Sequence, residues 1–185
     1  MAKRGSWYFE GYQSEEVLDR NGRTRQKLVY RGEWYGLGLE PAAFLRCKLI
    51  CLVLGLVCTV VYFLINLFPA QGGMTPWVGG PCLLGLVPLI FLWMGLINFL
   101  PSRLEWELRG LYAGYRRLKR WNLVFLVLMA ITLVAEIVYL VRNPEQAGAE
   151  LLYVLGVIIC VVLSAGLLIL QRRWPAMVVR GPDVR

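Results

Sequence analysis

The sequence predicts an all-α integral membrane protein, in which four transmembrane helices form a bundle with an N-terminal cytoplasmic β-hairpin and an amphipathic cytoplasmic helix. Three observations lead to this fold class. Apolar residues make up 58% of the 185 residues and charged residues 17%, against roughly 45–50% and about 25% in soluble domains. Four apolar stretches are long enough to cross a bilayer, which takes about 20 helical residues. Basic residues alternate between the segments that separate these stretches.

The chain divides into three parts around the apolar stretches. Residues 1–45 are expected to form a cytoplasmic segment, residues 46–171 the transmembrane domain, and residues 172–185 a cytoplasmic tail. The predicted spans are residues 49–68, 82–100, 123–141 and 151–170, with a cytoplasmic loop over residues 101–121. A cleavable signal peptide has its short apolar stretch at the very start of a chain, so we expect the first span to act as a signal anchor.

The distribution of Lys and Arg predicts the orientation. Nine precede the first span, none lies in residues 69–81, six lie in the middle loop, one follows the third span and four follow the fourth. Because short basic loops remain in the cytoplasm, both termini and the middle loop are expected there, in the plasma membrane of a bacterium. The net charge of +8 then reflects topology and contact with anionic headgroups, each basic residue contributing about 1 kcal/mol.

The N-terminal segment has the pattern of a β-hairpin. Asn21-Gly22 favours a two-residue type I′ turn, in which both central residues have positive φ. Aromatic and β-branched residues, which favour strands, dominate residues 7–12 and 27–35. A lone hairpin is marginally stable in water, so this one is expected to pack on the helix ends or on a partner, with Trp7 and Trp34 at lipid headgroups or at the partner surface.

The middle loop is predicted to form the amphipathic helix. Apolar residues recur on one side at helical spacing, and basic residues occupy the other side, among them Arg116, Arg117, Lys119 and Arg120. Such a helix lies at the inner headgroup level with its basic face toward anionic lipid or an acidic partner. The alternative is that it continues the third span into the cytoplasm.

Small residues recur every fourth position on two spans, a spacing that lets helices approach closely in lipid. The predicted packing faces contain Gly55 and Thr59 on the first span and Gly156, Cys160 and Ser164 on the fourth. In the second span, Pro88 lacks a backbone donor and is expected to kink the helix. The kink serves either packing or the shape of a cavity, and the sequence leaves both open.

Glu136 is the one ionisable side chain within a predicted span, which makes it a candidate functional residue. We expect it to be protonated or to hydrogen bond with Asn66 or Tyr153, which lie at the same level of their own spans. The alternative is that it extends to the membrane surface and has no role. Thr132 extends the polar face, whereas Asn98 lies at the opposite end of the second span, so a polar path is sparsely marked.

Composition excludes several enzyme classes. The chain has no histidine, which removes His-containing catalytic triads, His-ligated zinc and His-ligated haem. None of its five cysteines forms a CxxC pair, and no phosphate-binding loop occurs in the sequence. We therefore expect no catalytic residues, no cofactor and no metal.

These observations favour a non-catalytic membrane protein, an accessory, scaffold or sensor subunit whose hairpin and basic loop contact a partner. The expected partners are the bilayer with its anionic headgroups and either another membrane protein or further copies of the chain, but no nucleic acid. The alternative is a small homo-oligomeric channel or transporter with Glu136 in the pathway. One copy has too few polar residues in its spans to line a route, so this alternative requires an oligomer.

Overall fold

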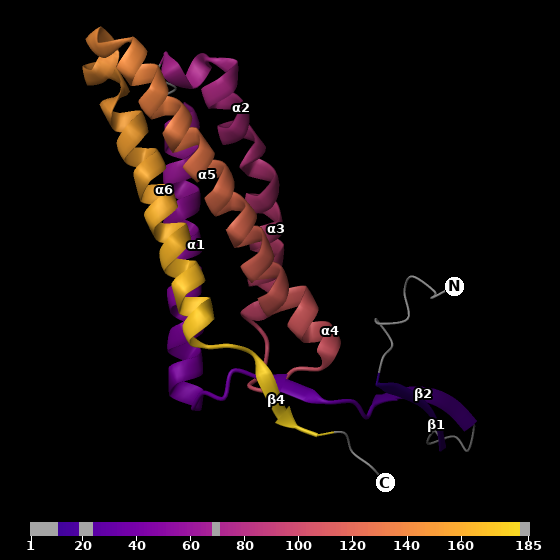
Figure 1. Ribbon diagram of the computed structural model, residues 1–185. Helices are drawn as coiled ribbons and strands as arrows, with labels where there is room; N and C mark the ends of the chain where they lie inside the picture. Colours follow the sequence, from indigo (N-terminus) through magenta and orange to yellow (C-terminus); the bar gives the residue numbers. More distant parts are fainter. Residues whose placement is uncertain (1–10, 19–23, 68–70, 182–185) are drawn as a thin grey trace.

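The computed structural model describes residues 11–18, 24–67 and 71–181, and it shows a bundle of long helices with small sheets at one end (Figure 1). The helices of the bundle are α1 (Pro41–Leu67), α2 (Pro76–Leu84), α3 (Leu86–Phe99), α5 (Arg117–Arg142) and α6 (Ala147–Arg173). We call the end that carries the strands the hairpin end. At the opposite end, the loop end, the short 3-10 helices η2 (Gly72–Met74) and η4 (Pro144–Gln146) connect α1 to α2 and α5 to α6.

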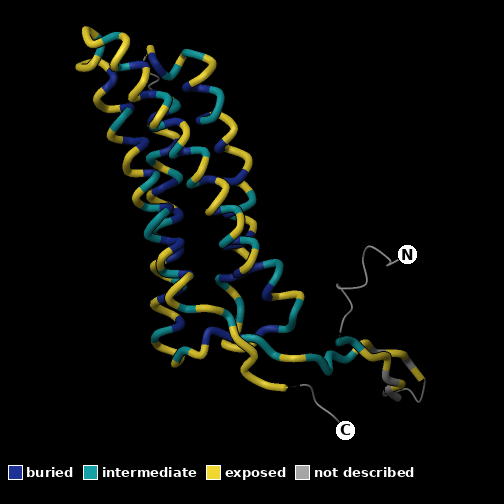
Figure 2. The backbone as a smooth tube through the Cα atoms, in the orientation of Figure 1, coloured by how far each residue is buried: buried dark blue, intermediate teal, exposed yellow. Residues whose placement is uncertain are grey.

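Four helical segments among the described residues are long and apolar enough to cross a membrane, namely Pro41–Leu67, Pro76–Phe99, Leu108–Arg142 and Pro144–Arg173. The predicted spans are therefore confirmed as helices of membrane-spanning length. Many leucine, isoleucine and valine side chains of these helices are exposed, and Figure 2 colours exposed residues along the whole length of the bundle. A bilayer would cover these side chains, while the buried faces hold the helices together.

Two clusters of buried side chains fill the bundle. The cluster at the hairpin end contains the rings of Phe44, Phe99, Trp106 and Tyr115, whose neighbouring centroids lie 5.6–6.0 Å apart. This spacing is favourable for aromatic pairs. The second cluster, toward the loop end, contains Tyr62, Val78, Phe125, Met129, Tyr139, Tyr153 and Val157. The two halves of the bundle are thus packed by different residue types, with more rings in close contact at the hairpin end.

Pro88, the predicted kink residue, lies in the first turn of α3. It has no N–H to donate to the carbonyl four residues earlier, and the helix is interrupted at Gly85 between α2 and α3. A Cβ on Gly85 would lie 2.7 Å from Met129 Cε, so α5 approaches the interruption closely. The Tyr62 hydroxyl on α1 donates to the Cys82 carbonyl at 2.9 Å. Neighbouring helices therefore fill the space at the interruption, which supports the packing interpretation.

The predicted amphipathic helix over residues 101–121 is wrong as a separate element. Residues 101–107 are not helical, and α4 (Leu108–Leu111), the π-helical turn η3 (Tyr112–Arg116) and α5 follow one another without a gap. The structure thus matches the alternative, an extension of the third span. The apolar side of this extension packs on α3 because a glycine allows close approach: a Cβ on Gly95 would lie 2.7 Å from Leu118 N.

Strands β1 (Tyr12–Leu18) and β2 (Thr24–Tyr30) form an antiparallel hairpin. The predicted hairpin is therefore present, with strands that differ from the predicted ranges. The turn dipeptide Asn21-Gly22 lies outside the described residues. The described register pairs Leu18 with Thr24.

The predicted second hairpin strand, residues 27–35, is divided between two sheets. Its last residues belong to β3 (Trp34–Gly36), which pairs with β4 (Met177–Arg180) from the other end of the chain. On its other side, Tyr35 N donates to Trp106 O at 2.8 Å and Trp106 N donates to Tyr35 O at 2.7 Å. Three segments far apart in sequence are thus joined at the hairpin end, and local sequence pattern does not indicate such long-range pairing.

Candidate functional site

Two carboxyl groups lie buried together at the loop end. Glu136 on α5 and Glu150 in the first turn of α6 are both 0% exposed. Both carboxyl groups lie against Gly72: its N–H donates to Glu150 Oε1, and a Cβ added to it would lie 2.8 Å from Glu136 Oε2. Among the described residues, no donor bonds to either carboxyl oxygen of Glu136 or to Oε2 of Glu150. Because buried carboxylates without partners are costly, this acid pair is a candidate site.

The connection between α1 and α2 closes over the acid pair. Gly72 N–H donates to Glu150 Oε1 at 2.8 Å, and a Cβ on Gly72 would lie 2.8 Å from Glu136 Oε2. The Thr75 hydroxyl donates to the Gly72 carbonyl at 2.6 Å and fixes the turn. Figure 1 shows the α1–α2 and α5–α6 connections close together at this end. A side chain at this position would therefore require the Glu136 carboxyl and the Tyr139 ring to shift.

The structure assigns Glu136 a different neighbour from those expected. The alternative that it extends to the membrane surface does not hold, because its side chain is completely buried. Asn66 donates its amide to the Tyr62 carbonyl at 2.7 Å, and Tyr153 packs beside Gly73, where an added Cβ would lie 3.2 Å from its ring. No hydrogen bond between either side chain and Glu136 occurs among the described residues.

The remaining polar candidates in the spans bond within their own helices. Thr132 is buried one turn from Glu136, and its hydroxyl donates to the Leu128 carbonyl at 3.0 Å. Asn98 is exposed toward the hairpin end and donates to the Met94 carbonyl at 2.7 Å. The structure therefore brings Glu136 together with Glu150 and not with a row of polar side chains.

The predicted small-residue face of the fourth span lies where α6 crosses α1. A Cβ on Gly156 would lie 2.1 Å from Ile65 Cγ2. Cys160 Sγ lies 3.8 Å from the Cys58 carbonyl oxygen, and Ser164 Oγ lies 3.8 Å from Cys58 Sγ. The short side chains on both helices permit this close crossing.

The predicted small residues of the first span lie against α3 instead. A Cβ on Gly55 would lie 3.5 Å from Leu96 Cδ2, an ordinary contact. The Trp93 indole N–H donates to Thr59 Oγ1 at 2.8 Å, and the Thr59 hydroxyl donates to the Gly55 carbonyl at 2.7 Å. This face therefore positions a tryptophan and leaves room for a methyl group at Gly55.

A second candidate site is a cleft at the hairpin end. Its volume is about 540 Å³, and its lining includes Trp34 of β3 and Asn98 of α3 together with the charged residues Arg103, Glu105, Glu107 and Arg109. Tyr12 of the hairpin donates to Glu107, and Leu108 N donates to the Tyr30 hydroxyl at 3.2 Å. Burial and the hydrogen bond to Glu107 raise the pKa of Tyr12 to about 12, so the phenol remains a donor at neutral pH. The hairpin is thereby held beside the cleft.

Strand β4 forms an open edge at the hairpin end, on the side of β3 away from Trp106. Its residues Met177, Val178 and Val179 are 47–49% exposed, and the side of β4 away from β3 pairs with no described strand. Val178 lies opposite Tyr35, whose own N–H and C=O bond to Trp106 on the far side. In an antiparallel sheet the residue opposite then directs its N–H and C=O outward. Val178 therefore presents a donor and an acceptor to the open edge.

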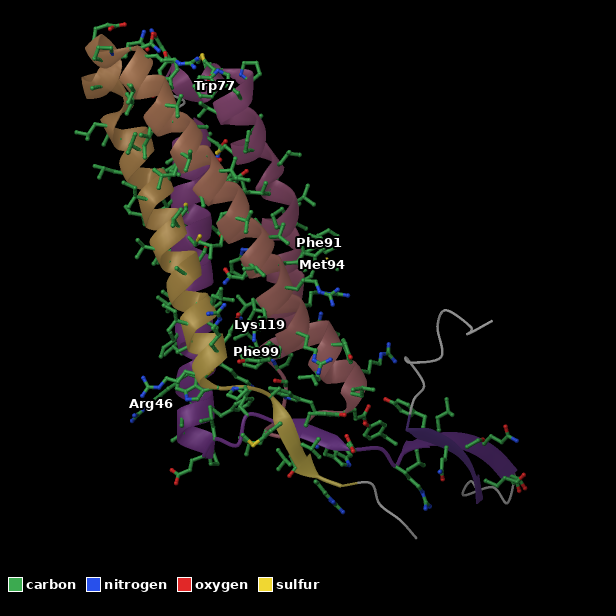
Figure 3. The ribbon with its side chains drawn as sticks, viewed as in Figure 1. Arg46, Trp77, Phe91, Met94, Phe99 and Lys119 are labelled. Carbon is green, nitrogen blue, oxygen red and sulfur yellow. The ribbon has the colours of Figure 1, made fainter. Side chains whose placement is uncertain are left out.

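Basic side chains gather toward the hairpin end. The predicted contact residues Arg116, Arg117, Lys119 and Arg120 lie where η3 meets α5, and the Arg116 guanidinium lies 4.4 Å from the centre of the Tyr112 ring. Figure 3 shows Arg46 and Lys119 in the half of the bundle nearer the strands and Trp77 at the loop end. Trp34 lines the cleft, and Trp7 lies outside the described residues.

Sequence reasoning missed Glu150 and Asn122. Glu150 directly precedes the predicted fourth span, and the helix begins a turn earlier, at Ala147, so a residue predicted to lie in a loop is buried in the bundle. Asn122, just before the predicted third span, is also buried and donates to the Ser164 carbonyl at 2.9 Å. Counting one extra turn at each span end would have found both residues.

Comparison of the chain with protein-family models, curated proteins and solved structures found no match. The acid pair, the cleft and the open edge of β4 are the structural features that bear on function.

Proposed function

We propose that this protein is a non-catalytic accessory or scaffold subunit of a membrane complex, and that its hairpin end holds an extended segment of another membrane protein. The open edge of β4 is the observation that carries the proposal. An exposed edge with free N–H and C=O groups pairs readily with an added strand. The half-exposed side chains of Met177 and Val179 provide apolar contacts for alternate residues of that strand.

Charge favours an acidic partner segment in the cytoplasm. The exposed side chains of Arg172 and Arg173 end α6 directly before β4, and the positive-inside rule favours a cytoplasmic hairpin end. We accordingly place both termini in the cytoplasm of a bacterial cell, with the basic residues near anionic headgroups. Acidic residues in the partner would increase the rate of encounter and select against basic competitors.

The burial of Glu136 gives the channel or transporter alternative less support. A residue that lines a pathway has to meet water or the transported ion during transport. Glu136 is 0% exposed beneath Gly72, and Asn66, Asn98 and Thr132 each donate to a carbonyl four residues earlier in their own helices. An oligomer of this chain would therefore need a rearrangement of the α1–α2 connection before Glu136 could serve a pathway.

The open edge can be tested without disturbing the β3–β4 pairing. Val178→Pro removes only the N–H that points outward, and proline is tolerated at sheet edges, whereas the matched control Val178→Ala keeps that N–H. With a photocrosslinking residue at Met177 in the full-length protein in cells, we expect a discrete protein adduct that Val178→Ala keeps and Val178→Pro lowers about tenfold, as loss of about 1.4 kcal/mol implies. An adduct equally strong in both variants, or none, would contradict the proposal.

A further inference from the structure

The acid pair at the loop end contains three carboxyl oxygens without a donor. These are Oε1 and Oε2 of Glu136 and Oε2 of Glu150, and the fourth oxygen, Glu150 Oε1, accepts Gly72 N–H at 2.8 Å. If both groups were ionised, two negative charges would face each other in a buried site, which is strongly unfavourable. Carboxyl pairs of this kind resolve the repulsion by sharing a proton.

The surroundings of the two carboxyl groups differ, and the difference indicates which of them carries the proton. Glu150 lies in the first turn of α6, where the positive end of the helix dipole stabilises an anion, and it also accepts the backbone N–H of Gly72. Glu136 receives neither contribution. It lies well inside α5, away from the N-terminus of that helix, and among the described residues no donor bonds to either of its carboxyl oxygens. Glu150 is therefore suited to be the carboxylate and Glu136 the acid.

We propose that Glu136 and Glu150 form a proton-binding site, in which the Glu136 carboxyl O–H donates to Glu150 Oε2 and the bound proton keeps the α1–α2 connection docked. One proton taken from water lowers the charge of the pair from −2 to −1. The remaining charge lies on Glu150, which the α6 N-terminus and Gly72 stabilise. When the proton leaves, repulsion between the two carboxylates favours release of Gly72 and entry of water.

A proton fits this site better than a metal ion. Among the described residues, no third Cys, Asp or Glu joins the pair in a group of potential metal ligands. Calcium takes six to eight oxygen ligands and magnesium keeps an octahedral shell, whereas the pair supplies four carboxyl oxygens, one of which already accepts Gly72 N–H. The small number of available ligands therefore favours a proton.

Other titratable or charged groups lie in the loop-end half of the bundle, and their titration has to be separated from that of the pair in any pH experiment. They are Tyr139 and Arg142 on α5, Tyr153 on α6, Cys82 on α2, Tyr62 on α1 and Glu145 on η4. Tyrosine and cysteine ordinarily titrate at pH about 10 and about 8.5, above the range in which a shared carboxyl proton is tested. Glu145 is exposed, which makes Glu145→Gln the matched control.

The proposal predicts a specific pH dependence of unfolding. The ordinary pKa of glutamate is about 4.3, so both carboxyl groups of the unfolded chain are ionised above that pH. The folded state, in which the pair keeps its shared proton, then holds one more proton than the unfolded state. Stability is therefore complete at acidic pH and is lost as the pH rises, with the unfolding constant increasing about tenfold per pH unit until the pair releases its proton. Tyr and Cys residues contribute only at higher pH.

The experiment combines infrared spectra with thermal unfolding of the full-length protein in detergent between pH 5 and pH 8. We expect a protonated-carboxyl band at neutral pH that Glu145→Gln keeps and Glu136→Gln removes. Glu136→Gln, whose amide N–H replaces the carboxyl O–H, is expected to fold with a pH-independent midpoint. Glu150→Gln is expected to be less stable than Glu136→Gln because the pair then loses its preferred anion.

Two results would overturn the proposal. The first is the absence of a protonated-carboxyl band in the unsubstituted protein, which needs no variant and therefore does not depend on the folding of any. The second is stabilisation by sodium, calcium or magnesium chloride that Glu136→Gln abolishes, which would assign the site to a metal ion. Neither result bears on the β4 edge, so this site and the proposed function can fail separately.

Discussion

The two ends of the bundle are closed by different kinds of contact. At the hairpin end, four buried aromatic rings pack together and three distant segments exchange backbone hydrogen bonds. At the loop end, glycines bring the backbone directly against α5 and α6 above two buried carboxyl groups. The hairpin end leaves a cleft and a strand edge exposed, whereas the loop end leaves no room for a Cβ at Gly72.

The exposed strand edge at the hairpin end is suited to binding a partner, whereas the packed turn at the loop end encloses two buried carboxyl groups. A strand edge with exposed apolar side chains retains free hydrogen-bonding groups for a partner. A glycine-lined turn over buried acids excludes water and makes the site sensitive to the addition of one methyl group, because packed interiors accommodate added volume poorly. Substitutions that add volume should therefore act most strongly in the loop-end half, and substitutions that remove hydrogen bonds should act locally at the hairpin end.

The largest effect is expected at the crossing of α1 and α6. In Gly156→Leu the new Cβ meets Ile65 Cγ2 at 2.1 Å, and the methyl of a β-branched residue has little freedom to move. We expect a loss of about 3 kcal/mol in the free energy of unfolding, measured by thermal or denaturant unfolding in detergent. Gly166→Leu on the same helix, where a Cβ meets nothing within 4 Å, is the control; equal losses in both variants would contradict the close crossing.

A smaller loss is expected where η2 meets α2. A Cβ on Gly79 would lie 2.2 Å from the Gly73 carbonyl oxygen, whereas a Cβ on the neighbouring Gly80 meets nothing within 4 Å. Because a backbone carbonyl cannot turn aside as a side chain can, Gly79→Ala should cost about 1–3 kcal/mol and loosen the turn over the acid pair. Hydrogen exchange of residues 71–75 should accelerate in Gly79→Ala and not in Gly80→Ala.

The spans and their breaks could be predicted from the sequence because both depend on local composition. A run of about 20 apolar residues has few alternatives to a membrane-spanning helix, and Pro88 carries its effect in its own backbone. The acid pair could be predicted only in part: Glu136 is unusual within its span, but its proximity to Glu150 depends on how α5 and α6 pack. No spacing within one helix contains that information.

The β3–β4 sheet and the extension of the third span show the same limit. Residues 27–35 look like one strand because strand preference is local, yet Trp34 pairs with Arg180 at the far end of the chain. The basic stretch before the third span looks amphipathic in isolation, and it becomes part of a longer helix because Gly95 and Gly114 let it pack against α3. In both regions tertiary contacts decide between alternatives that the sequence left equivalent.

The smallest effect is expected for the attachment of the hairpin. Tyr12→Phe removes the hydrogen bond to Glu107, worth about 1 kcal/mol, so hydrogen exchange in β1 and β2 should accelerate about fivefold without a change in the unfolding of the bundle. Burial and that hydrogen bond raise the pKa of Tyr12 to about 12, from an ordinary value of about 10. The stabilisation of the hairpin attachment by this hydrogen bond is therefore complete below pH about 10 and is lost as the pH rises through about 12.

Tyr35→Phe is the matched control for this attachment. The Tyr35 hydroxyl donates to Glu33 Oε2 at 2.9 Å, two residues away, and burial together with this bond likewise raises its pKa to about 12. Both variants lose a bond from a phenol to a carboxylate, but only the Tyr12 bond joins the hairpin to the loop before α4. If Tyr35→Phe accelerates exchange in β1 and β2 as much as Tyr12→Phe does, the bond between Tyr12 and Glu107 is not what attaches the hairpin, and other contacts hold it at this end of the bundle.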